Sequence, residues 1–202
     1  MKKKQIESKK RVTDYGEVYT DTEQVKAMLD LIPEDAEDID TTYLEPAMGD
    51  GNFLEEILRR KLKKAIMVSE SIQAFRINVL RSVSSIYGVD IQEDNVLEGR
   101  VRLLNTVSDE TLRYFGLTID CRLSVAIGKV LERNLVCGNT LEAVANTGVP
   151  LVFCEWTVKD SGRIYCREYR FDDMLSHGGV STKCIAMHRY NWLVPEKQVS
   201  AA

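Results

Sequence analysis

Residues 44–54 have the composition of a ligand-binding turn. Their sequence, Leu-Glu-Pro-Ala-Met-Gly-Asp-Gly-Asn-Phe-Leu, places Gly49 and Gly51 between a short strand-like run and an amphipathic stretch. Glycine has no side chain, so a ligand can approach the backbone closely. The first amide groups of a following helix lack intrahelical partners and can donate to polar ligand atoms. A lone Gly-x-Gly also occurs in plain turns, so this segment alone leaves both interpretations open.

Three other segments place polar or aromatic residues beside predicted strands. Asp90 ends the run Tyr-Gly-Val-Asp, and an acidic residue at the carboxyl end of a second strand can bind both ribose hydroxyls. Asn139 follows the run Leu-Val-Cys-Gly, and its amide can bond an adenine edge. Upstream, Tyr19 and Thr20 end the string Gly-Glu-Val-Tyr-Thr, which can also be a helix-capping turn.

Taken in order, these segments resemble the signatures of S-adenosylmethionine-dependent DNA adenine methyltransferases of bacterial and phage restriction-modification systems. Residues 45–54 are similar to the family string Asp-Pro-Ala-Cys-Gly-Ser-Gly-Asn-Phe-Leu. Glu45 stands where the family has Asp, Met48 where it often has Cys, and Asp50 where it often has Ser. The resemblance covers about residues 12–156.

The resemblance implies a binding site for S-adenosylmethionine. In this assignment the loop after the first strand holds the methionine part, through Glu45, Pro46, Ala47, Gly49 and Gly51. Tyr19 and Thr20 line the cofactor pocket. Asp90 binds the ribose, Ile91 packs on the adenine, and Asn139 replaces the Asp that reads the adenine amino group. This replacement predicts weakened cofactor binding.

The chain departs from the family where the catalytic motif is expected. Adenine methylases carry Asp/Asn-Pro-Pro-Tyr/Phe after the fourth strand, whereas residues 151–157 read Leu-Val-Phe-Cys-Glu-Trp-Thr. In a catalytic interpretation, Glu155 accepts the hydrogens of the target amino group and Trp156 stacks on the flipped base. In a structural interpretation, Glu155 is a strand-end carboxylate and Trp156 is a packing residue.

Two main functions follow from these observations. The first is a methyltransferase that acts on DNA adenine, with a partner protein that supplies target recognition because the chain has no room for a recognition domain. The second is a non-catalytic, methylase-like protein that binds S-adenosylmethionine or DNA in a regulatory or partner role. A nicotinamide-dependent oxidoreductase is a weaker third hypothesis, since no Gly-x-Gly-x-x-Gly loop occurs.

The predicted elements alternate between strands and helices, which indicates a parallel α/β sheet. We expect a Rossmann-like class I methyltransferase fold, with a mostly parallel sheet, flanking helices and an abbreviated carboxyl end that forms a β-hairpin. The expected strands are residues 41–45, 85–90, 134–137 and 150–156, with 163–170 as the hairpin partner. Helices are expected after Thr20 and over residues 53–64, 70–84, 93–104 and 109–133, the last with a break near Gly116. From residue 171 we expect irregular structure.

The length of 202 residues favours a single domain. We divide it into a flexible basic arm (1–14), a cofactor-binding core (15–156), and a hairpin with a carboxyl-terminal tail (157–202). Two basic clusters, one in the arm and one at residues 59–64, are solvated surface or phosphate contacts. The net charge of −4 argues against the whole molecule being a nucleic-acid binder.

The composition also indicates the cellular compartment of the protein and whether it has a metal site. No apolar run is long enough to span a bilayer, and the amino terminus does not resemble a secretory signal. The five cysteines are odd in number and contain no Cys-x-x-Cys pair. The two histidines lack a neighbouring cluster at ligand spacing. These features predict a cytoplasmic protein with reduced thiols, no metal site and no membrane association.

Overall fold

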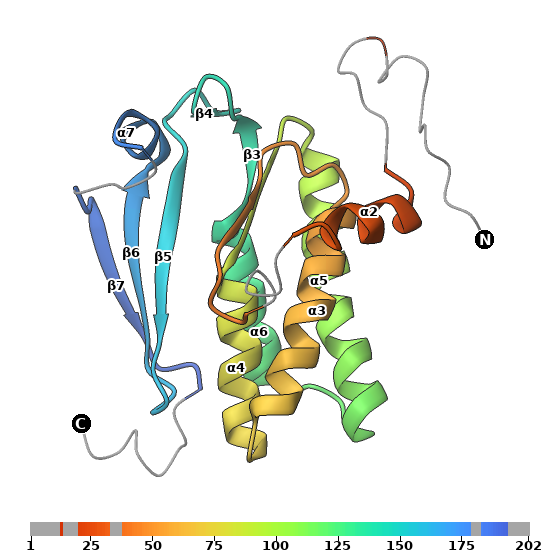
Figure 1. Ribbon diagram of the computed structural model, residues 1–202. Helices are drawn as coiled ribbons and strands as arrows, with labels where there is room; N and C mark the ends of the chain where they lie inside the picture. The colour runs from red at the N-terminus through yellow and green to blue at the C-terminus, as the bar shows by residue number, and fades with distance from the viewer. Residues whose placement is uncertain (1–12, 14–19, 33–37, 179–182, 194–202) are drawn as a thin grey trace.

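A computed structural model describes residue 13 and residues 20–32, 38–178 and 183–193 (Figure 1). Tyr19 and nearly all of the predicted basic arm lie outside the described residues. Within them, no helix is long and apolar enough to cross a membrane.

The first sheet has four strands in the order β1-β2-β3-β4. Strands β1 (Tyr43–Glu45), β2 (Ile86–Asp90) and β3 (Leu135–Asn139) are parallel. The short β4 (Val144–Ala145) pairs antiparallel with β3. The predicted α/β class with a mostly parallel sheet is therefore confirmed for this part of the chain.

Four helices connect the parallel strands. Helices α3 (Asn52–Val68) and α4 (Ile72–Ser84) lie between β1 and β2, and α5 (Glu93–Phe115) and α6 (Cys121–Asn134) lie between β2 and β3. Ser71 and Asp120 cap α4 and α6 by accepting hydrogen bonds from backbone amides of the first turn. The expected end of this helix at residue 104 is wrong, because α5 continues to Phe115. The expected break near Gly116 is confirmed, since Gly116 caps α5 in a left-handed conformation.

The helices bury apolar stripes against the sheet and against one another. On α3 the buried positions follow helical spacing, from Leu54 through Ile57 and Leu58 to Leu62. They join a core with residues of α4, α5 and α6 and with Ile86 and Leu135 of the sheet.

Lys61 is an unusual member of the α3 buried face, because its side chain is 0% exposed. Its Nζ donates to the carbonyls of Asp38 (2.7 Å) and Thr41 (2.6 Å) and to the Ser85 hydroxyl (2.9 Å). The ammonium group therefore anchors the segment that leads into β1. Helix α2 (Thr22–Leu29), capped by Asp21, buries Val25 and Leu29 in the main core, and Asp30 after it pairs with Arg60 of α3 (2.6 Å).

A second sheet is built from β5 (Val152–Val158), β6 (Ile164–Arg170) and β7 (Ala186–Tyr190), all antiparallel. The expected hairpin is confirmed as β5 and β6. The chain after residue 171 is more ordered than expected, since it forms α7 (Phe171–Ser176) and the third strand β7. The expectation that residues 150–156 extend the parallel sheet is wrong, because β5 pairs with β6 instead.

Strand β5 runs opposite to the three parallel strands of the first sheet. Near its start, Phe153 packs in one cluster with Val89, which lies at the carboxyl end of β2. Near its end, Thr157 and Val158 border a cavity with Ser84 and Ser85, just before β2 begins. In Figure 1 this sheet stands beside the helices, and β5 contacts α4 and α6.

Candidate functional site

The loops after β1, β2 and β3 meet at the carboxyl edge of the first sheet. The amide of Met48 donates to the Val89 carbonyl (2.9 Å), which ties the glycine loop to β2. The Thr140 hydroxyl donates to the Pro46 carbonyl (2.7 Å), which ties the same loop to the turn after β3. Three segments that are distant in the sequence therefore form one edge.

Asp90 is the centre of this edge. Its Oδ2 accepts a hydrogen bond from the Gly49 amide (2.9 Å). Its Oδ1 accepts bonds from the Gln92 amide (2.8 Å) and from the Asn95 side chain (3.1 Å). The carboxylate is therefore held in one orientation, between the glycine loop and the start of α5.

The glycine loop needs its glycines for both conformation and space. Gly49 and Gly51 have φ values of 51° and 88°, in the left-handed region that favours glycine. A Cβ on Gly51 would lie 3.3 Å from the Cα of Gly99 in α5. Any side chain here would push the loop away from that helix.

Met48 packs beneath the loop and is 4% exposed. A Cβ on Gly88 would lie 2.5 Å from the Met48 sulfur, and one on Gly99 would lie 2.4 Å from its terminal methyl. Gly88 and Gly99 thus leave the volume that Met48 fills. At this position the resembled family often has the smaller Cys.

The negative charge of the loop is partly screened. Burial raises the pKa of Glu45, while a hydrogen bond from the Ala47 backbone acts in the opposite direction. Arg102 of α5 donates to Asp50 (2.8 Å), Asn52 (2.9 Å) and Glu55 (2.9 Å). Arg102 therefore fixes the loop and the first turn of α3 to α5.

The amino end of α3 points into this site. Its N-cap is Gly51, which makes no side-chain capping bond to the first turn. Gly51 offers no side chain, so the amides of this turn can meet a ligand instead.

The remaining predicted cofactor residues lie around the same edge. Thr20 accepts a hydrogen bond at its carbonyl from Asn52 (3.4 Å), which places it beside the start of α3. Ile91 is 44% exposed next to Asp90. Asn139 uses its Oδ1 to accept bonds from the amides of Leu141 (3.0 Å) and Glu142 (3.3 Å), so that oxygen stabilises the local turn.

Glu155 and Trp156 are not brought together at this edge. They are neighbours on β5, so their side chains leave opposite faces of the strand. Trp156 packs with the main core, and its indole donates to Asn134 (2.7 Å). Glu155 is exposed and accepts a hydrogen bond from Tyr169 (3.1 Å). Because β5 runs away from the carboxyl edge, the expectation that it ends there is wrong.

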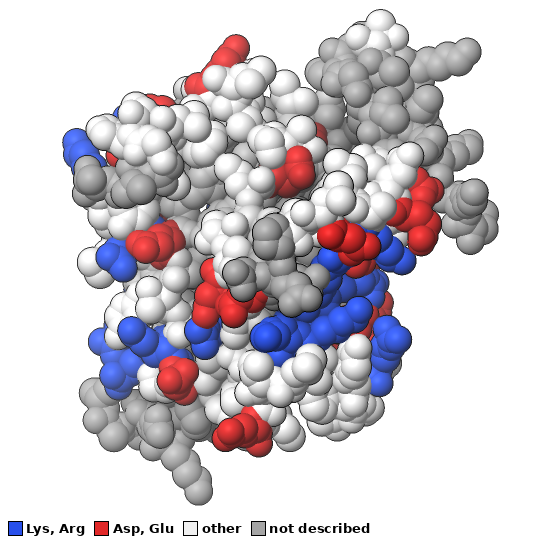
Figure 2. All heavy atoms as spheres, in the orientation of Figure 1, with Lys and Arg blue, Asp and Glu red and all other residues white. Residues whose placement is uncertain are grey.

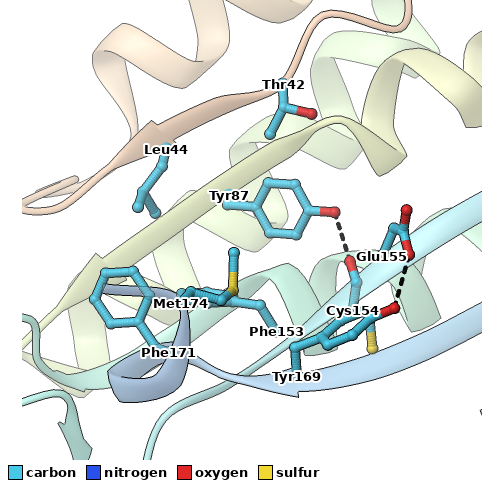
Figure 3. A pocket seen from close by; sticks show the side chains of 9 residues that line it. All are labelled: Thr42, Leu44, Tyr87, Phe153, Cys154, Glu155, Tyr169, Phe171 and Met174. Carbon is cyan, nitrogen blue, oxygen red and sulfur yellow. Dashed lines mark hydrogen bonds between the residues drawn. The ribbon is translucent and has the colours of Figure 1, made fainter. Parts of the chain in front are cut away.

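A cavity of about 320 Å³ lies between the two sheets (Figure 3). Glu155 borders it together with a mostly apolar and aromatic set that comes from β1, β2, β5, β6 and α7. The other lining residues are Thr42, Leu44, Tyr87, Phe153, Cys154, Tyr169, Phe171 and Met174. No feature of the sequence predicted this cavity, since it depends on how the second sheet docks.

The basic run at residues 59–64 is largely engaged within the fold. Arg59 pairs with Glu55 (2.9 Å) and with Glu110, and Arg60 pairs with Glu56 (3.2 Å). Figure 2 shows basic side chains gathered over the helices with acidic ones at their border. This arrangement favours a structural role for Arg59 and Arg60 over phosphate contact.

Comparisons with known protein families, with curated proteins and with solved structures find no match. The structure places Thr20, Glu45, the 46–51 loop, Asp90, Ile91 and Asn139 around one edge. It separates Glu155 and Trp156 from that edge, and their catalytic role stays a prediction without geometric support. The sequence analysis missed Arg102 and Thr140, which bind the loop. It also missed Gly99, although a glycine inside an amphipathic helix is a recognisable sign of close packing.

Proposed function

We propose that this chain binds S-adenosylmethionine at the carboxyl edge of the first sheet. The observation that carries the proposal is the hydrogen bond from the Gly49 amide to Asp90. It joins the loop after β1 to the end of β2, the two places where Rossmann-like methyltransferases hold the two halves of this cofactor. The parallel β1-β2-β3 arrangement with connecting helices is consistent with a Rossmann-like fold of that class.

The residues of the edge fit the chemical groups of the cofactor. S-adenosylmethionine supplies a methyl group on a positively charged sulfonium. Glu45 places a carboxylate near the loop, and the first turn of α3, which begins at a glycine, offers amide donors to the ligand's carboxylate. In this proposal the ribose hydroxyls bond to the remaining lone pairs of the Asp90 carboxylate, whose oxygens already accept bonds from Gly49, Gln92 and Asn95. Ile91 exposes an apolar surface for a planar base.

The reaction that we propose is methyl transfer to adenine in DNA, in the cytoplasm, with a partner protein supplying target recognition. It rests on the resemblance of residues 12–156 to DNA adenine methylases. A second candidate is a non-catalytic protein that binds the cofactor as a regulatory or partner subunit. This candidate is favoured by Trp156, whose indole is committed to Asn134 and the core, and by Glu155, which lies away from the glycine loop.

One experiment separates the two functions. The purified chain is incubated with methyl-labelled S-adenosylmethionine and either duplex or single-stranded DNA, and label in the recovered DNA is counted. A Gly49→Val variant is the control, because valine is strained at the positive φ of Gly49 (51°) and so disturbs the loop. Label that depends on Gly49 supports the methyltransferase. Saturable cofactor binding without label in DNA supports the non-catalytic protein, and no cofactor binding contradicts both.

A further inference from the structure

Four side chains with metal-binding chemistry converge on one face of the second sheet. Cys154 comes from β5, Cys166 and Glu168 from β6, and His188 from β7. Glu168 is the cross-strand partner of Cys154, and His188 is the cross-strand partner of Cys166. Directly paired residues on neighbouring strands point to the same face, so the sheet itself brings the four together.

The donor atoms are close to one another. The two sulfurs are 2.7 Å apart, and the Sγ atoms and a Glu168 oxygen all lie within 4.8 Å. Metal–sulfur bonds of about 2.3 Å at a tetrahedral angle hold two sulfurs about 3.8 Å apart, so the two side chains must separate by about 1 Å to take an ion. Both thiols are buried, at 3% exposure for Cys154 and 0% for Cys166. The Nε2 of His188 is 3.0 Å from Oε1 of Glu168.

We propose that Cys154, Cys166 and Glu168 bind a divalent, thiol-preferring metal ion of the zinc type. Thiolate and carboxylate are ligand types of such sites, which take four ligands in a tetrahedron, so these three side chains would leave the fourth position to a small exogenous ligand such as water. In this proposal His188 orients the Glu168 carboxylate from outside the ligand set. The ion would fasten β5 to β6.

The charge of the surroundings fits this ion. Two thiolates and one carboxylate carry three negative charges, and a divalent ion compensates two of them. Arg133 of α6 donates to Glu168, and its Nη1 lies 3.8 Å from the Cys154 sulfur. Its guanidinium supplies the third positive charge, so the occupied cluster would be neutral, as a buried site requires.

A disulfide is the competing use of two adjacent thiols. A disulfide would need neither a carboxylate nor an imidazole. Yet Glu168 lies opposite Cys154, and His188 lies opposite Cys166, on the neighbouring strands. Arg133 and His188 both contact the Glu168 carboxylate at Oε1. Its Oε2 therefore remains for an ion, at least with respect to the described residues.

The test is a titration of the reduced, metal-free full chain with Co²⁺, followed by absorption spectroscopy. We expect one equivalent to bind, with thiolate-to-cobalt charge transfer in the near ultraviolet and the visible bands of a tetrahedral ion. Cys154→Ser and Cys166→Ser should each weaken Co²⁺ binding at least tenfold. His188→Gln should weaken it by roughly 10–100-fold, the usual effect of losing an orienting partner.

A triple variant controls for Co²⁺ binding by the other three thiols. Cys121→Ser, Cys137→Ser and Cys184→Ser together leave the cluster untouched and keep only Cys154 and Cys166. The spectrum should persist in this variant. The proposal is overturned if the reduced wild-type chain shows no charge-transfer band, if the band is lost in the triple variant, or if it survives in a Cys154→Ser, Cys166→Ser double variant.

Discussion

At the scale of single residues, Lys61 is a lysine whose side chain is fully buried. Burial lowers the pKa of its ammonium group from 10.5 to about 8. Between these two values the unfolded chain binds more protons than the folded chain, so this residue makes stability rise with pH. We expect the free energy of unfolding of wild type relative to Lys61→Met to increase from pH 8 towards pH 10.5.

Urea unfolding at several pH values in this window measures the effect. Lys64→Met, at an exposed position of the same helix, is the matched control and should leave the pH slope unchanged. A wild-type slope equal to that of Lys61→Met would show that the ammonium is not perturbed.

The pair Met48 and Gly99 makes a second residue-scale prediction. A Cβ on Gly99 would lie 2.4 Å from the Met48 methyl. Gly99→Ala should therefore destabilise the wild type by about 1–3 kcal/mol through overpacking. In a Met48→Ala background the same change should cost much less, because the clashing methyl is gone. A double-mutant cycle by urea unfolding measures the coupling, and equal costs in both backgrounds would refute this packing account.

At the scale of elements, the hydrogen bonds of Arg102 connect α5 to the glycine loop. Its side chain is 18% exposed and pairs with Asp50, which is 2% exposed. Removing one partner of a buried pair costs about 3–5 kcal/mol. We expect Arg102→Ala to lower stability by an amount near the bottom of that range and to weaken cofactor binding, since the loop loses its tether.

Arg113→Ala is the control for this element, because Arg113 is 70% exposed and lies 3.8 Å from Glu110. Exposed pairs contribute about 0–1 kcal/mol, so this change should be nearly silent in thermal unfolding and in cofactor binding. If the two variants behave alike, the loop does not depend on α5.

The order of strands and helices up to β3 could be predicted from the sequence, because apolar periodicity and capping residues are local signals. The sheet to which β5 belongs could not be predicted from the sequence. A short apolar run such as residues 150–156 fits a parallel or an antiparallel strand equally well, and its neighbours are set by packing. Phe153 against Tyr87, with ring centroids 5.6 Å apart, is one such contact.

Which residues of the candidate sites could be predicted also depends on whether strand neighbours could be predicted from the sequence. Glu45, Asp90 and Asn139 could be placed at one edge because they follow successive parallel strands. The cluster of Cys154, Cys166, Glu168 and His188 could not be found from spacing, since only the β5-β6-β7 register brings it together. The sequence-based expectation of no metal site rested on sequence spacing alone.

At the scale of the whole molecule, Trp156 joins the second sheet to the helices. Its indole donates to Asn134, a fully buried residue of α6 whose amide donates in turn to the Ile86 carbonyl (2.9 Å). Trp156→Phe leaves a buried acceptor unpaired, which costs about 1–3 kcal/mol. Tyr169→Phe, which removes an exposed hydroxyl, should change stability by less than about 0.5 kcal/mol.

Because the two sheets share this core, the chain should unfold in one cooperative transition. Tryptophan fluorescence and far-ultraviolet circular dichroism should give coincident urea midpoints in the wild type and in Trp156→Phe. A fluorescence transition well before the loss of helix signal would show that the second sheet unfolds independently.

The central claim, a cofactor site at the carboxyl edge, is tested most directly by calorimetric titration with S-adenosylmethionine. We expect saturable binding at one site per wild-type chain. Asp90→Ala removes a charged acceptor worth about 1.5–3 kcal/mol, so affinity should fall by about tenfold or more. Asp109→Ala, an exposed carboxylate on α5, should bind as the wild type does. Absence of saturable heat from a folded wild-type chain, or equal affinity in all three proteins, would contradict the account.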